Sequence, residues 1–194
     1  CMGGRGAMAH FIKPHDPSIA VTCGPALTCF AYPADNLGVI GAMHLAQAGD
    51  VIVCANDAYT TTALVGDLVI GMMKNRGVAA LVTDGMIRDQ IGIEPWNLTL
   101  FHQGVTPNSP AKTGPGTVGL PITIAGVTVE TGDMIICDRD GVVVVPFDRI
   151  DEVAATLSKL VAAEGEVEAQ VKAGMNEPGY IAEMMASSQT RYVD

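Results

Sequence analysis

The sequence is poor in charged and aromatic residues, and it has no long uninterrupted apolar run. Charged residues make up 16% of the 194 residues and aromatic residues 5%, with 11 basic against 21 acidic side chains and a formal net charge of −10. The basic side chains form no cluster, which argues against a protein that coats nucleic acid. No segment reaches the ~18 apolar residues of a membrane span, and no signal-peptide pattern is present. We therefore expect a cytoplasmic protein without a membrane or nucleic-acid partner.

Cysteine is also scarce and irregularly spaced. The five cysteines are odd in number and show no C-x-x-C spacing. This pattern does not fit a disulfide framework, and it favours reduced thiols in a cytoplasm.

Apolar residues, by contrast, are abundant. They make up 48% of a chain that is long enough for one sizeable core, and no break in composition divides it, so we predict a single domain over residues 1–194. Few charged side chains are available to cover the surface. Some of the apolar excess is therefore expected to face other subunits of a homo-oligomer.

The most informative stretch runs from residue 66 to residue 89. Gly66-Asp67 opens an apolar run with helical spacing that stops at Asn75-Arg76-Gly77, and Ala79–Thr83 then has the pattern of a buried strand. A turn follows, and Arg88-Asp89 comes just past the strand's carboxyl end. Ligand crevices of open α/β sheets lie at such ends, so the pattern predicts an α/β fold with a site for an anion or a metal here.

Carboxylates at both ends of this unit are hard oxygen ligands of the kind that Mg²⁺ or Mn²⁺ binds. With an arginine beside the metal, Asp67 and Asp89 would form a site that polarises a carbonyl and stabilises an enolate. Each residue also has a simpler interpretation. Arg88-Asp89 could be a loop salt bridge, and Asp67 a helix-capping carboxylate.

A long C-terminal helix is predicted over residues 148–174, from Asp148 as N-cap to Gly174 as the stop. Its apolar residues follow a 3,4 spacing that Glu164 interrupts. A carboxylate on a packed face needs a partner or a task, whereas on a frayed stripe it would simply be solvated. Both interpretations remain open from the pattern.

Three other segments carry expectations. Gly24-Pro25 predicts a bend between two strand segments, and Asp138-Arg139-Asp140-Gly141 predicts a hairpin turn rather than a calcium loop. The segment from His102 to Gly116, which contains Lys112, is rich in proline, glycine, serine and threonine. It is expected to be a loop that acts as a lid or a partner surface.

Asp67, twenty intervening residues and Arg88-Asp89 resemble the D-x20-R-D signature of the class II pyruvate aldolases that cleave 4-hydroxy-4-methyl-2-oxoglutarate and 4-carboxy-4-hydroxy-2-oxoadipate. The wider family includes regulators of RNase E activity, which share the fold and much of the central motif but are not aldolases. Further segments similar to this family are Gly24-Pro25-Ala26-Leu27-Thr28, Gly49-Asp50-Val51, Arg76-Gly77, Asp84-Gly85, Gly132-Asp133 and Asp138 to Pro146.

The resemblance implies a compact β/β/α sandwich of the swivelling-domain type, assembled as trimers or hexamers with active sites between subunits. It implies that Asp89 binds Mg²⁺ or Mn²⁺ directly, that Asp67 and Glu164 hold it through water, and that Arg88 contacts the substrate's 2-oxo oxygen. Glu164 would come from a neighbouring subunit on which the 148–174 helix packs. An N-terminal helical segment expected in the family is largely missing from this chain.

The implied reaction is retro-aldol cleavage of a 4-hydroxy-2-oxo diacid to pyruvate and a second oxo-acid, with oxaloacetate decarboxylation through the same enolate. Backbone amides at Gly66, Leu68 and Val69 would hold the pyruvyl carboxylate, and Lys112 would meet the distal carboxylate. The alternative is a non-catalytic regulator that binds and inhibits a partner protein. The regulators have a shorter tail without the glutamate, so Glu164 favours the enzyme.

Overall fold

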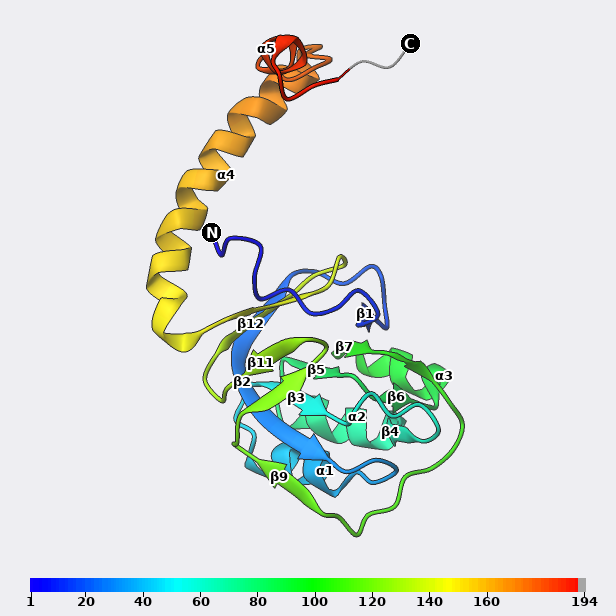
Figure 1. Cartoon of the computed structure of the whole chain (residues 1–194). Helices are drawn as coiled ribbons and strands as arrows, with labels where there is room; N and C mark the ends of the chain where they lie inside the picture. Colours follow the sequence, from blue (N-terminus) through cyan, green and yellow to red (C-terminus); the bar gives the residue numbers. More distant parts are fainter. Residues whose placement is uncertain (192–194) are drawn as a thin grey trace. The chain divides into compact units, whose positions relative to one another are not determined.

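The computed structural model describes residues 1–191 as two units (Figure 1). A compact α/β unit spans Met2–Asp151, and residues 152–191 belong to a helical unit. No helix within residues 1–191 is long and apolar enough to cross a membrane.

Helices and strands alternate through most of the compact unit. The helices are α1 (Leu37–Leu45), α2 (Asp67–Asn75), α3 (Gln90–Ile93), α4 (Ile150–Lys172) and α5 (Ile181–Ala186), with 3-10 turns η1 (Glu94–Trp96) and η2 (Phe147–Arg149). The strands are β1 (Lys13–Pro14), β2 (Thr22–Ala31), β3 (Val51–Ala55), β4 (Ala63–Val65), β5 (Ala80–Thr83), β6 (Met86–Ile87), β7 (Thr99–His102), β8 (Gly104–Val105), β9 (Gly116–Val118), β10 (Ile122–Ile124), β11 (Val127–Val129), β12 (Met134–Cys137) and β13 (Val142–Val145).

The main sheet has the strand order β1-β7-β5-β3-β2-β12-β13, with β9 also paired to β2. Its central strands β2, β3, β5 and β7 are parallel, whereas the outer strands pair antiparallel. Figure 1 shows β2 as the long blue strand that crosses the unit. A small parallel sheet β4-β6-β8 and the hairpin β10-β11 complete the unit. The expected mixed α/β fold is confirmed.

Both faces of the main sheet are buried, which explains the continuous apolar runs of its central strands. Along β3, Ile52 and Cys54 pack into one core with side chains of α1, α2 and α3. The alternate residues Val51, Val53 and Ala55 pack into a second core with the β10-β11 hairpin. The hairpin, the sheet and the helices are therefore stacked as β, β and α layers.

Two sequence predictions in this unit have opposite outcomes. The hairpin turn at Asp138 is confirmed, because Asp138 Oδ1 accepts the amides of Asp140 and Gly141 between β12 and β13. The prediction of two strand segments separated by a bend at Gly24-Pro25 is wrong, because β2 is one strand that runs through these residues. The strand changes partner there instead, since residues up to Pro25 pair with β12 and those from Ala26 onward pair with β3.

The predicted C-terminal helix is present as α4. It ends as predicted near Gly174, whose φ of +104° suits glycine and whose amide bonds to the Val171 carbonyl. Asp148 is not its N-cap, because Phe147–Arg149 form a 3-10 turn before the helix begins. The apolar residues Leu157 and Val167 are exposed on α4. Packing of this helix on a neighbouring subunit stays a prediction.

Candidate active site

Asp67 is placed by the junction of β4 and α2. Gly66 has extended backbone and precedes the helix, and its carbonyl accepts the Ile70 amide at 3.2 Å. The Asp67 carboxylate accepts the Leu68 amide at 2.8 Å. Asp67 thus caps its own helix, as one interpretation of the sequence expected. The Leu68 amide would become available to a substrate carboxylate only when Asp67 turns away from it.

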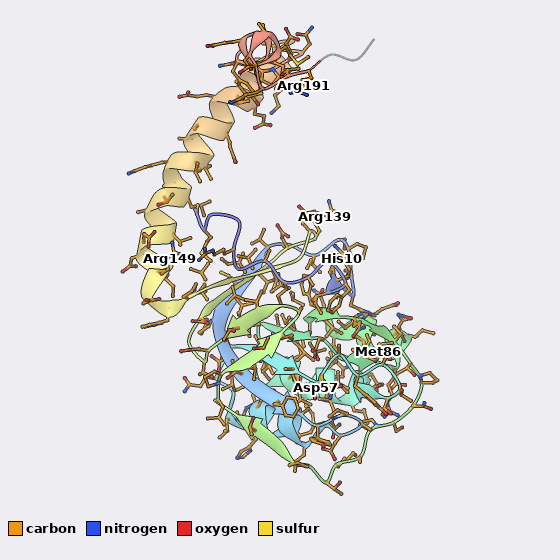
Figure 2. The ribbon with its side chains drawn as sticks, in the orientation of Figure 1. His10, Asp57, Met86, Arg139, Arg149 and Arg191 are labelled. Carbon is orange, nitrogen blue, oxygen red and sulfur yellow. The ribbon has the colours of Figure 1, made fainter. Side chains whose placement is uncertain are left out.

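Arg88-Asp89 lies directly beside that junction because β6 pairs with β4. The pairing joins Ala63 to Met86 and Val65 to Ile87, and the Arg88 amide then donates to the Val65 carbonyl at 3.1 Å. Figure 2 labels Met86 on the strand that leads into the site. Two short parallel strands therefore deliver both predicted acidic residues to one edge.

The turn between β5 and β6 is held by a buried carboxylate. Asp84 accepts the amides of Asn56 at 2.6 Å and Ala58 at 3.0 Å, which ties the end of β5 to the end of β3. Burial raises the pKa of Asp84, and these two hydrogen bonds oppose the effect. This residue supports the edge on which the site is built.

Asp89 adopts a left-handed backbone conformation, with φ 60° and ψ 41°, just before α3. Aspartate tolerates this conformation better than most residues, and such positions are frequent at functional sites. Its Oδ2 lies so close to Gly66 that a Cβ added there would be 2.4 Å away. In the same way, a Cβ on Gly92 would lie 2.6 Å from Asp67 Oδ2. Each carboxylate therefore packs against a glycine of the opposite element.

The Arg88 guanidinium group makes an ion pair and a hydrogen bond, and its Nε is within ion-pair distance of Asp89 without a hydrogen bond to it. Its Nε lies 3.2 Å from Asp89 Oδ2, and one terminal nitrogen donates to Ser109 Oγ. The side chain is 33% exposed. The loop salt bridge expected from the sequence is present, and it also holds a cationic fork beside the two carboxylates.

A cavity of about 400 Å³ contains most of the predicted substrate contacts. Its lining comprises Asn36, Leu37, Ile40, Val65, Gly66, Asp67, Leu68, Val69, Met72, Arg88, Ser109, Pro110 and Lys112. Asp89 lines a second cavity of about 390 Å³, which shares Arg88 with the first. The structure thus brings together every predicted site residue of the compact unit around Arg88.

The segment that carries Ser109 and Lys112 is fastened to the unit, which argues against a freely moving lid. Asp35, which is only 4% exposed, accepts the amides of Thr113 at 2.7 Å, Gly114 at 2.8 Å and Leu37 at 2.7 Å. Burial raises the pKa of Asp35, but these hydrogen bonds outweigh it, and the pKa is lowered overall. A β-bridge between Asp35 and Ala111 adds a further attachment.

Sequence reasoning missed Asn36 and Ser109 as site residues. Asn36 is 3% exposed and lines the cavity, and its Oδ1 is a buried atom without a hydrogen-bond partner. Ser109 bonds Arg88 from a segment distant in sequence. No local pattern marks either residue, because tertiary pairing of residues 34–36 with 111–114 brings them to the cavity.

The residues present fit a cation that prefers oxygen ligands, such as Mg²⁺ or Mn²⁺, better than a metal that prefers thiolate or imidazole ligands. Among residues 1–191, no three histidine, cysteine, aspartate or glutamate side chains converge as a metal-binding group. Mg²⁺ keeps several waters and needs only one or two carboxylates, so Asp89 would hold it directly and Asp67 would hold it through water. Glu164 lies on α4 with its side chain exposed, and its contribution from a neighbouring subunit stays a prediction.

A larger hollow of about 530 Å³ lies elsewhere in the compact unit, lined by the segment from His15 to Thr22 and by residues between Gln90 and Thr99. Its lining includes Asp16 and Glu94 but no lysine or arginine. A dicarboxylate would be repelled there. The smaller cavity at Arg88 is therefore the better candidate for an acidic substrate.

Comparison with protein families gives one match over most of the chain. Residues 1–144 match the RraA-like family, described as Aldolase/RraA. A protein of Halalkalibacterium halodurans that is named as a candidate 4-hydroxy-4-methyl-2-oxoglutarate aldolase is 39% identical over 162 residues, which cover 84% of this chain and 75% of that protein.

Solved structures of similar fold include two RraA proteins. The RNA-processing inhibitor RraA from Thermus thermophilis is 27% identical with a TM-score of 0.67, covering 72% of this chain and 84% of that one. RraAS2 of Streptomyces coelicolor, an unusual member of the RNase ES inhibitor RraA family, is 25% identical with a TM-score of 0.77, covering 87% of each chain. Relatives of this fold thus carry names of both an enzyme and an inhibitor.

Proposed function

Because the chain belongs to the RraA-like family of aldolases and RraA proteins, we propose that it is a metal-dependent lyase that cleaves a 4-hydroxy-2-oxo diacid to pyruvate and a second oxo-acid. The observation that supports this most strongly is the position of Arg88 between two cavities, with Asp67 lining one and Asp89 lining the other. A cation and two carboxylates at one point suit a reaction in which negative charge develops on a carbonyl oxygen.

The named homologue supports the substrate class. The relative from Halalkalibacterium halodurans carries the name of an aldolase for a 4-hydroxy-2-oxo diacid. The cavity matches such a molecule chemically, because Arg88 and Lys112 are cations in its lining and Leu37, Ile40 and Met72 are apolar. We assign the pyruvyl end to the Arg88 side and the distal carboxylate to Lys112.

In the proposed reaction, Arg88 donates hydrogen bonds to the 2-oxo oxygen and stabilises the charge that collects there. A bound Mg²⁺ or Mn²⁺ supplies further polarisation of that carbonyl. Asp89 would hold the metal, and its ion pair with Arg88 Nε orients the guanidinium group. The amides of Gly66 and Val69 bind the substrate carboxylate, joined by that of Leu68 when Asp67 turns away from it.

The remaining residues handle protons. Asp67, together with Glu164 of a neighbouring subunit, holds the water that removes the proton of the C4 hydroxyl. The C3–C4 bond then breaks, its electrons form the C2–C3 double bond of the pyruvate enolate, and the C4 carbon leaves as a carbonyl. Protonation at C3 gives pyruvate. Oxaloacetate reaches the same enolate by loss of CO₂, so the site should decarboxylate it.

The test is pyruvate release from oxaloacetate and from 4-carboxy-4-hydroxy-2-oxoadipate, measured with Mg²⁺, with Mn²⁺ and with EDTA. We expect metal-dependent release that Asp89→Asn abolishes. Asp57→Asn is a matched control, because exposed Asp57 also has a left-handed backbone, with φ 52°, and lines neither site cavity. Release no faster than the metal-only blank from both substrates would reject the proposal for these oxo-acids.

A second candidate function is inhibition of a partner protein, which the likeness to the inhibitor RraA of Thermus thermophilis favours. A regulator of this kind needs no metal, and Asp89→Asn would leave its binding intact. Unchanged partner inhibition by that variant, combined with absent pyruvate release, would favour the regulator.

A further inference from the structure

Trp96 packs onto bare helix backbone at Gly71. Gly71 lies in the middle of α2 and Trp96 is the last residue of η1. A Cβ added to Gly71 would lie 2.5 Å from Trp96 Cζ2, 2.6 Å from Cε2 and 3.1 Å from Cδ2. The indole ring therefore occupies the space that the side chain of any other residue would take.

Gly71 is required for space and not for its conformation. Its φ lies outside the left-handed region, and alanine would favour the helix there by about 1 kcal/mol. Gly66 and Gly92 also lack a positive φ, so they too are required for space and not for their backbone conformation. Glycine at these sites thus carries a cost in helix propensity or backbone entropy that close packing explains.

The three glycines lie along one contact between the elements that carry the site carboxylates. Gly66 meets Asp89, Gly92 meets Asp67, and Gly71 meets Trp96. A hydrogen bond of 2.8 Å from Lys74 Nζ of α2 to the Asn97 carbonyl closes the far end of this contact. The contact therefore controls the distance between α2, which bears Asp67, and the segment 88–97, which bears Asp89.

We infer that Trp96, seated on Gly71, is a positioning residue that sets the separation of the Asp67 and Asp89 carboxylates and the direction of Arg88. This inference rests on the proposed function of that site. Trp96 lines neither site cavity, so it acts through the packing of η1 on α2 and not by contact with the substrate. A bulkier residue at 71 would push η1 and α3 away from α2 and open the spacing of the carboxylates.

The experiment is a double-mutant cycle with Gly71→Ala, Trp96→Leu and the two combined. The readouts are kcat, KM, the Mg²⁺ concentration that gives the half-maximal rate of pyruvate release, and the Mg²⁺ dissociation constant measured by calorimetry without substrate. Gly71→Ala should lower kcat/KM by about tenfold to a hundredfold, because displacements near 1 Å cost that much, and should raise the half-maximal Mg²⁺ concentration. Trp96→Leu removes the clashing ring atoms, so the double variant should recover most of the Gly71→Ala loss.

Two controls separate positioning from general stability. Gly141→Ala changes a glycine of the compact unit, in the β12-β13 turn, that has no atom within 4 Å of the added Cβ and no positive φ, and it should leave all of these readouts unchanged. Val129→Ala weakens the core on the other face of the sheet, where Val129 is fully buried, and should lower the thermal midpoint without changing the Mg²⁺ dependence.

The outcomes are distinguishable. An active wild type whose Gly71→Ala variant keeps the wild-type Mg²⁺ dependence and kcat/KM would overturn the inference alone. The inference would also be overturned if the fold-losses in kcat/KM of the two single variants simply multiply in the double variant. A wild type without pyruvate release would instead reject the proposed function. Should Gly71→Ala fail to fold, Trp96→Phe, which keeps an aromatic ring but leaves part of the space empty, must raise the half-maximal Mg²⁺ concentration.

Discussion

Asp35 attaches the segment that carries Ser109 and Lys112 to the compact unit. Its hydrogen bonds determine how much the free energy of unfolding should fall when its charge is removed. Asp35 Oδ2 accepts the amides of Thr113 and Gly114, and Oδ1 accepts that of Leu37. In Asp35→Asn only one side-chain oxygen remains, and the NH₂ group faces amides that can only donate. Charge-assisted hydrogen bonds contribute about 1.5–3 kcal/mol each, and buried donors left unpaired cost about 1–3 kcal/mol. We expect a loss of about 2–5 kcal/mol in the free energy of unfolding.

The functional consequence should be specific to substrate binding. The loosened loop carries Ser109, which bonds Arg88, and Lys112, so KM for a diacid should rise more than kcat falls. Asp133→Asn is the matched control, because buried Asp133 also accepts two backbone amides, those of Glu130 and Phe147, at 2.9 Å each, yet does not line the cavity.

Urea unfolding gives the stability and steady-state kinetics gives KM. The lowered pKa of Asp35 fixes the pH dependence: the stabilisation is complete above the unfolded value of 3.8 and is lost as pH falls through the lower folded value. A folded Asp35→Asn protein with wild-type KM, or an equal rise in KM for Asp133→Asn, would refute the reasoning.

Three further predictions concern pH, substrate charge and a turn. Burial, assisted by the charge of nearby His15, lowers the pKa of His102 from 6.5 to about 4. Because the unfolded chain binds this proton first, the free energy of unfolding should fall by roughly 3 kcal/mol as pH falls from 6.5 to about 4, with no effect above pH 6.5. His102→Gln should flatten this slope in urea titrations and exposed His10→Gln should not; parallel slopes would contradict the prediction. Lys112→Met should raise KM for diacids about tenfold, because one exposed charged contact with the distal carboxylate is lost, and it should leave inhibition by pyruvate unchanged. If diacid binding and pyruvate binding weaken equally, Lys112 lies at the pyruvyl end instead. Gly126→Val places a branched side chain at a φ of +82° in the β10-β11 turn, so it should lower the free energy of unfolding by about 1–2 kcal/mol without changing KM. A raised KM would contradict the prediction that this turn does not affect the site.

The local architecture of the site was predictable from the sequence because its signals are local. Gly66-Asp67 begins α2 as predicted, Ala80–Thr83 is the buried strand, and Arg88-Asp89 follows it at the carboxyl end. Glycine stops and apolar periodicity report backbone conformation within a few residues, so they locate such elements well.

Contacts between distant segments were not predictable in the same way. Asn36 and Ser109 enter the cavity only because Asp35 pairs with Ala111, and no periodicity encodes that bridge. The continuity of β2 through Gly24-Pro25 depends on a change of partner strand, which the local turn signal could not reveal. Propensity describes the segment itself, whereas tertiary pairing decides how the segment is used.

The most direct test of the central claim is the exchange of pyruvate methyl protons with D₂O, followed by proton NMR. This exchange requires the enolate and does not depend on the distal half of the substrate. We predict exchange that needs wild-type protein and Mg²⁺ or Mn²⁺ together, disappears with EDTA and is absent in Asp89→Asn. Exchange no faster than with the metal alone would contradict the proposal that this site forms the pyruvate enolate.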